Sequence, residues 1–143
     1  MAPSEFLGGK VLKRALTVVH PPFGPDAPTI KRLMLPQGEL AQFYDADEPI
    51  RYLACIELRA GSVRGNHYHL AKRESLYVVQ GEGMLIVEDI ESKARDTVSF
   101  RAGDLLSIHT GIAHAVQIVG PGQAVEFSGT RFDPADIHKF LLI

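Results

Sequence analysis

Features of secreted and membrane proteins are scarce in this sequence. Cys55 is its one cysteine, so an internal disulfide is excluded, which fits a reducing compartment. No stretch reaches the roughly 18 apolar residues that a membrane span needs, and MAPSEFLGGK lacks a basic segment followed by an apolar one. We therefore expect a cytoplasmic protein with no membrane partner. Cys55 stands between apolar neighbours, which predicts a small buried side chain.

Neither sign of charge predominates in the sequence. The net charge is −2, and lysines and arginines are scattered rather than grouped, so no basic face for nucleic acid is predicted. Hydrophobic residues make up 45% and charged residues 22% of the 143 positions, which is typical of a globular domain with one core.

No interior segment keeps a helical period over ten residues, whereas short apolar stretches separated by Gly, Asp or Pro recur throughout. In YLACIEL, residues 52–58, Tyr52, Ala54, Ile56 and Leu58 would face one way and Leu53, Cys55 and Glu57 the other. Many short strands in a chain of this size predict an all-β sandwich or barrel. We expect strands at 30–35, 40–44, 51–58, 65–69, 75–80, 83–88, 97–100, 105–108, 113–119 and 124–128.

The two ends of the chain differ from this pattern. Four prolines in PPFGPDAP, residues 21–28, exclude a helix there. We therefore expect residues 1–29 to form an N-terminal strand with a proline-rich arm, and residues 30–143 to form the barrel. Near the C-terminus Asp133 can cap a helix and Pro134 suits its first position, so FDPADIHKFLLI predicts one short terminal helix.

One stretch, GSVRGNHYHLAKRESLYVVQG at 61–81, places polar side chains in an apolar, strand-like segment. His67 and His69 lie two residues apart, so their imidazoles share one face of a strand, and Glu74 begins the next strand. Buried without partners, each would cost several kcal/mol. A divalent cation removes that cost, since imidazoles and a carboxylate are good metal ligands. A hydrogen-bonded polar cluster without metal is the alternative.

A fourth ligand is available in GDLLSIHTGIAHAVQI, residues 103–118. There His114 shares a strand face with Val116, so it can point inward. Three nitrogens and one oxygen do not select one metal. We expect a divalent ion, with Zn²⁺ first and Fe, Mn or Ni as alternatives.

These residues resemble the cupin family. Its first motif, G-x5-H-x-H-x4-E-x6-G, is matched without a gap at Gly61, His67, His69, Glu74 and Gly81. The second is matched at Gly103, Gly111 and His114, with His109 in place of the usual proline and Ile118 in place of the usual asparagine. The resemblance implies a cupin fold, a double-stranded β-helix or jelly-roll barrel, and a homodimer. It also implies a metal held by His67, His69, Glu74 and His114.

RGNHYHLAKRE at 64–74 and RFDPAD at 131–136 are similar to the cupin half of bacterial capsular-polysaccharide nucleotide-sugar enzymes. In that family the metal-dependent cupin epimerises a UDP-4-keto-sugar at C3, and a dehydrogenase half then reduces the product. Here no strand is followed by G-x-G-x-x-G opening a helix, so we expect reduction to fall to another protein. The resemblance implies a nucleotide-sugar isomerase or epimerase that transfers a proton next to a ketone.

Four further residues are candidates for this chemistry. His109, on the turn before His114, and Tyr52 are candidate acid–base groups. Arg64 and Lys72 could contact a diphosphate through charge-assisted hydrogen bonds. The alternatives are an exposed loop histidine, a tyrosine packed in the barrel wall, and two ordinary surface cations.

Two other functions remain open for the same ligands. An Fe-dependent dioxygenase would use the open metal positions for O2 and substrate. A non-catalytic module would bind a small molecule or sugar and keep the metal as a structural element.

Overall fold

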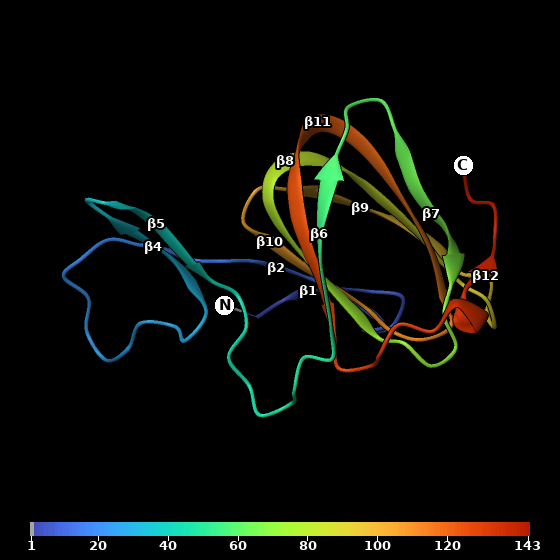
Figure 1. Cartoon of the computed structure of the whole chain (residues 1–143), viewed down its shortest axis with the longest axis horizontal. Coiled ribbons are helices and arrows are strands. Elements are labelled where there is room, and N and C mark those ends of the chain that lie inside the picture. The colour runs from blue at the N-terminus through green and yellow to red at the C-terminus, as the bar shows by residue number, and fades with distance from the viewer. Residues whose placement is uncertain (1) are drawn as a thin grey trace.

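The computed structural model describes residues 2–143, which form an almost entirely β structure (Figure 1). The all-β prediction is confirmed. No helix within residues 2–143 has the length and apolar character to cross a membrane. The strands are β1 Ser4–Phe6, β2 Val11–Ala15, β3 Val18–Val19, β4 Lys31–Leu35, β5 Gly38–Gln42, β6 Tyr52–Leu58, β7 Val63–Tyr68, β8 Glu74–Asp89, β9 Arg95–Arg101, β10 Asp104–Ile108, β11 Ile112–Ser128 and β12 His138–Lys139.

Two long strands, β8 and β11, organise the barrel. They pair antiparallel along most of their length, and the pairing shifts register between Ile118 and Ala124. The first part of β8 also pairs with β10, and its second part pairs with β9. In the same way β11 pairs first with β7 and then with β6. Each long strand therefore pairs with three other strands.

The long strand β8 bends where the sequence predicts a turn between two strands. We expected separate strands at 75–80 and 83–88, but the chain continues through Gly81 as one strand. Gly81 has φ of 112°, a conformation that glycine adopts without strain. A Cβ at this position would lie 3.0 Å from the carbonyl oxygen of Gly120 on β11. Gly81 thus bends β8 and lets β11 approach without interrupting the sheet.

The interior is filled by one apolar cluster whose members come from facing strands. Alternate residues of β6 are more deeply buried, as the period of two in YLACIEL predicts. The cluster comprises Val11, Leu58, Leu76, Val78, Leu85, Val87, Val98, Phe100, Leu106, Ile108, Ile112, Val116, Ile118 and Ala124. Four of its members, Leu58, Leu76, Ile108 and Val116, line a cavity together with polar side chains, which therefore border an apolar interior.

Strands β3, β4 and β5 form a separate sheet. The predicted strands at 30–35 and 40–44 exist as β4 and β5, but they pair with each other and with β3 rather than with the barrel. Figure 1 shows the β4–β5 hairpin standing away from the barrel. β1 and β2, by contrast, join the barrel sheet through β10. The division of the chain between residues 29 and 30 stays a prediction.

The predicted C-terminal helix is wrong. Asp133 and Pro134 act as expected, since the Asp133 carboxylate accepts from the Ala135 N–H and Pro134 begins a turn, but the result is one 3₁₀ turn, Pro134–Asp136. The backbone is extended again at Ile137, and β12 pairs with β7. Pairing with the open edge of β7 replaces the helix that the local signals favour.

The prediction that Cys55 is buried is also wrong. Cys55 is exposed, and Leu53 on the same face of β6 is 65% exposed. β6 pairs only with β11, so it is an edge strand. The alternation was correctly predicted, but no layer covers its outward face.

We expect Leu106→Ala to lower the free energy of unfolding by about 2–5 kcal/mol, because Leu106 is fully buried in the apolar cluster. Urea denaturation measures the change, and Leu53→Ala, on the exposed face of β6, is the matched control. A loss below about 1 kcal/mol at Leu106 would contradict this description of the core.

Candidate functional site

Four metal-ligand side chains meet at the open end of the barrel. His67 lies on β7 and His69 directly follows that strand, Glu74 is the first residue of β8, and His114 lies on β11. One potential ligand atom from each lies within 4.8 Å of the others. The structure therefore brings together the four residues that the sequence singled out, and we call them the ligand cluster.

The close approach of β7 to β11 positions two members of this cluster. His67 and His114 are direct partners in the pairing, and the register shifts immediately after His114. Gly65 lies at this irregularity with φ of 90°, and a Cβ on it would come within 2.7 Å of the His114 carbonyl oxygen. Only glycine fits there, which explains the glycine of RGNHYH.

Backbone carbonyl groups orient two of the imidazoles. His69 Nδ1 lies 2.8 Å from the carbonyl oxygen of Asp136, and His114 Nδ1 lies 3.0 Å from that of Ile112. A carbonyl oxygen can only accept, so each Nδ1 carries hydrogen and donates. Nε2 of each ring then faces the cluster and, when the ring is neutral, is the nitrogen whose lone pair a metal ligand requires.

Burial and mutual contact shift the ionisation of the cluster. Burial alone would raise the pKa of Glu74, but His114, whose Nε2 is 2.6 Å from Oε1, and Lys72 outweigh it and lower that pKa. Burial would lower the pKa of His114, but Glu74 outweighs it and raises that pKa. Burial, followed by the neighbouring imidazoles, lowers the pKa of His67 to about 4. His67 is therefore neutral at physiological pH and able to bind a cation.

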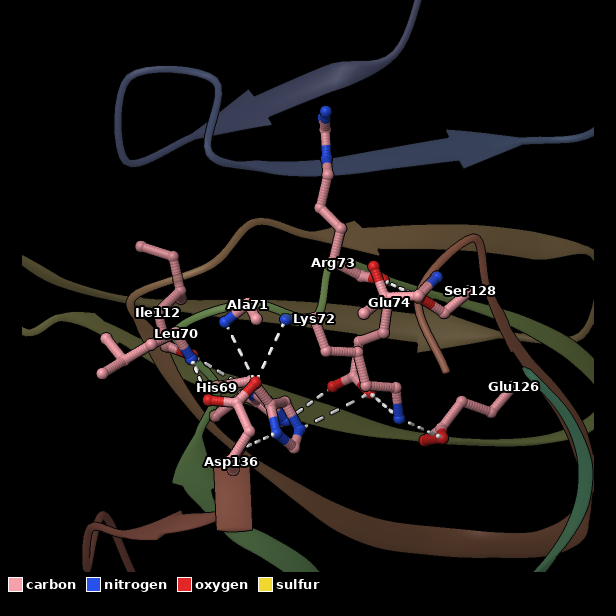
Figure 2. A network of polar contacts seen from close by, with 12 residues as sticks. His69, Leu70, Ala71, Lys72, Arg73, Glu74, Ile112, Glu126, Ser128 and Asp136 are labelled. Atoms are coloured by element: carbon pink, nitrogen blue, oxygen red, sulfur yellow. Dashed lines mark hydrogen bonds and ion pairs between the residues drawn. The ribbon is translucent and has the colours of Figure 1, made fainter. Parts of the chain in front are cut away.

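A second group of charges adjoins the cluster (Figure 2). Lys72 Nζ lies 3.5 Å from Glu74 Oε2 and donates to Glu126 Oε2 at 3.1 Å. The ammonium also lies 4.2 Å from the ring centre of Tyr52, a cation–π contact. Burial and the charge of Glu74 raise the pKa of Glu126, although Lys72 opposes them. Lys72 thus links two carboxylates and one aromatic ring.

The ligand cluster opens into a cavity of about 360 Å³. Its wall is mostly apolar, with residues such as Ile56, Leu58 and Val116, and its polar lining includes Arg64, Glu126 and three members of the cluster. A largely apolar pocket with a few convergent polar groups is the usual form of a small-molecule site.

A comparison with protein families matches residues 37–137 to the polysaccharide biosynthesis C-terminal domain. The chain belongs to this family. No curated protein matches its sequence. The match covers the whole ligand cluster and ends one residue after Asp136.

Solved structures place the family member in the cupin fold. The rmlC epimerase of Mycobacterium tuberculosis has a TM-score of 0.74 at 15% identity, covering 97% of this chain and 72% of that one. ChmJ, a 3'-monoepimerase from Streptomyces bikiniensis solved with dTDP-quinovose, has a TM-score of 0.74 at 16% identity, with the same coverage. The capsular polysaccharide assembling protein CapF from Staphylococcus aureus has a TM-score of 0.59 at 19% identity, covering 74% of this chain and 31% of that one. At these identities the likeness shows a shared fold, as the cupin motifs predict.

The other sequence-predicted residues of this family member lie in different places. Arg64 lines the cavity. Lys72 is 6% exposed and faces Glu74 and Glu126, so it is not an ordinary surface cation. Tyr52 is half-buried beside Lys72 and stacks on Phe132. His109 is exposed, contacts Thr110 and is absent from the cavity lining, so the structure does not bring it to the ligand cluster.

Glu126 lines the cavity but was not among the residues predicted from the sequence. It occupies an inward position of β11 between Ala124 and Ser128, which are both buried. The available signal was one carboxylate on the inner face of an apolar strand, a costly placement without a cation. That signal is weak because a single glutamate forms no spacing pattern with another ligand-type residue, unlike the two histidines of the HYH stretch.

We expect Lys72→Met to lower the free energy of unfolding by about 3 kcal/mol at pH 7, because it leaves the buried Glu74 and the half-buried Glu126 carboxylates without their shared cation. Thermal and urea denaturation of the chelator-treated protein measure the loss. Arg73→Met is the control, since Arg73 is exposed and points away from the cluster in Figure 2. Equal effects of the two substitutions would show that the Lys72 ammonium does not stabilise the fold by balancing the charges of Glu74 and Glu126.

Proposed function

We propose that this chain is a metal-dependent isomerase or epimerase that moves a proton next to the ketone of a nucleotide-linked sugar. The observation that carries the proposal is the ligand cluster at the end of an apolar cavity, with a separate carboxylate, Glu126, on the cavity wall. The family, polysaccharide biosynthesis, and the sugar-nucleotide ligand of ChmJ support this substrate class.

The residues present fit a divalent cation. Three imidazoles and one carboxylate are donors for Zn²⁺, Fe, Mn or Ni, and the two backbone-bonded rings already direct Nε2 inward. When bound, such a cation would supply positive charge that stabilises the negative charge developing on a carbonyl group next to the reacting carbon. We place Zn²⁺ first among the candidates.

The chain itself would handle the proton through Glu126. Its carboxylate lines the cavity but is not one of the four cluster ligands, so it is available to take a proton from the substrate carbon and, once protonated, to return a proton to the substrate. Lys72 holds the carboxylate by its hydrogen bond to Oε2, and Tyr52 packs against the Lys72 ammonium. Tyr52 and Lys72 therefore position the base, while His109, outside the cavity, has no part in the proposed reaction.

The cavity wall and its one guanidinium would bind the substrate. Ile56, Leu58 and Val116 exclude water from the reacting carbon, which strengthens the charge interactions there. Arg64 presents a charge that suits a phosphate group of a nucleotide-linked sugar. We also propose a homodimer, as the cupin resemblance implies.

We expect the wild-type protein, loaded with Zn²⁺, to exchange solvent deuterium into a dTDP- or UDP-linked 4-keto-sugar. Glu126→Gln should slow the exchange by about 10²–10⁴-fold, because the proton acceptor is lost, while Zn²⁺ binding is kept. Proton NMR of the sugar follows the exchange, and Gln117→Glu, an exposed position on the same strand, is the control.

No exchange with any such sugar would contradict the proposed reaction. Fe(II)-dependent consumption of O2 would instead favour a dioxygenase. Ligand binding that survives metal removal, without turnover, would favour a non-catalytic module.

We expect a chelator to lower the melting temperature of the metal-loaded protein by roughly 5–10 °C, because binding to the folded state stabilises it. The variant His114→Ala, which lacks one cluster member, should respond much less. Calorimetry before and after chelation measures both shifts, and an unchanged wild-type melting curve would contradict the metal site.

A further inference from the structure

The C-terminal residues Asp136 to Ile143, which we call the C-terminal clasp, run beside the strand that carries His67. Within the clasp, β12 pairs with β7, with Lys139 opposite His67 and His138 opposite Tyr68. Figure 1 shows the C-terminus next to β7. The clasp therefore borders the cluster, although none of its side chains is a cluster member.

Asp136 makes the densest contacts of the clasp (Figure 2). Its Oδ1 accepts from the Leu70 N–H at 2.8 Å, and its Oδ2 accepts from the N–H groups of Ala71 at 3.0 Å and Lys72 at 3.2 Å. Its Oδ1 also lies 3.4 Å from His138 Nε2. The three N–H groups belong to the short loop between His69 and Glu74, so one carboxylate fixes the spacing of two ligands.

Asp136 acts on His69 a second time through its backbone. Its carbonyl oxygen is the acceptor for His69 Nδ1 at 2.8 Å. This bond holds the imidazole plane and keeps Nε2 free to bind a cation. The side chain and the main chain of one residue thus orient the loop and the ring.

Asn66 fastens the other end of the clasp. Its Oδ1 accepts from the Leu142 N–H at 2.9 Å, its Nδ2 donates to the Ile143 carbonyl at 3.1 Å, and its backbone carbonyl accepts from the Phe140 N–H at 2.8 Å. Asn66 immediately precedes His67 and has φ of 59°. Leu142 is buried in a small apolar cluster with Ala113 and Ala115 of β11, beside His114.

We infer that Asp136 and Asn66 are positioning residues that hold the ligand cluster ready for a cation, an inference that rests on the proposed metal site. Asp136 fixes the orientation of His69 and the position of the start of β8. Asn66 fixes the position of the strand that carries His67. Partners that orient metal ligands from outside the coordination set typically change affinity by about 10–100-fold when they are removed.

Asp136→Asn tests the inference, with Asp133→Asn as the matched control three residues earlier. An asparagine side chain in place of Asp136 could offer only one acceptor oxygen to three N–H groups, whereas the Asp133 side chain caps only the 3₁₀ turn, and asparagine caps as well as aspartate. We expect Asp136→Asn to weaken Zn²⁺ binding by about 10–100-fold, measured by competition with a chromophoric chelator. The visible absorption of the Co²⁺-loaded protein should change as well, and both readings should stay close to those of the wild type for Asp133→Asn.

Asn66→Gly is the second variant, because glycine keeps the positive φ and removes the side-chain contacts with Leu142 and Ile143. We expect faster amide exchange at both residues and weaker Zn²⁺ binding. If Asp136→Asn binds Zn²⁺ with wild-type affinity, the positioning role inferred for the clasp is wrong, while the proposed metal site stands. If Asp136→Asn does not fold, wild-type affinity in Asn66→Gly has the same meaning. Failure of the wild-type protein itself to bind Zn²⁺ would overturn the proposed metal site and, with it, the inference.

Discussion

The buried carboxylate of Glu74 is the constraint on which the rest of the site depends. It is 7% exposed at the edge of an apolar interior, where an unpaired charge would cost several kcal/mol. Its two oxygens are compensated from two sides, by His114 at 2.6 Å and by Lys72 at 3.5 Å. The barrel can hold this carboxylate only if His114 and Lys72 stay in place. The contacts that position these two residues therefore also stabilise the fold.

Charge balance links the ligand cluster to Glu126. Lys72 is shared between Glu74 and Glu126, so one ammonium faces two carboxylates and the group needs further positive charge. A proton on His114 or a divalent cation at the cluster would supply it. Since both would act through Glu74, the charge at the cluster sets the field at Glu126, the carboxylate that we propose takes the substrate proton. The ligand cluster and Glu126 are therefore one electrostatic unit.

Three members of the ligand cluster, His67, His69 and Glu74, could be predicted from the sequence because their signal is local. Two histidines at i and i+2 share a face in any strand, and the glycines and Glu74 follow at fixed spacing. Glu126, Lys72 as a buried cation and the C-terminal clasp could not be predicted in the same way. Their roles come from pairings between residues far apart in the chain, such as Lys72 with Glu126 or His69 with Asp136. The prediction of a terminal helix was wrong for the same reason, since capping signals are local and the pairing of β12 with β7 is not.

The two stretches that resemble the capsular-polysaccharide enzymes, RGNHYH and RFDPAD, are neighbours in space. Asn66 of the first contacts Leu142 and Ile143 in the clasp, and Asp136, which ends the second stretch and begins the clasp, holds the loop after His69. Their occurrence in one chain is therefore explained by contacts between them, without any contact to a substrate. Arg64 differs, because it lines the cavity and has no part in the clasp. In the proposed function, Arg64 and the apolar cavity wall would select the substrate, while Asn66 and Asp136 would keep the ligand cluster in place.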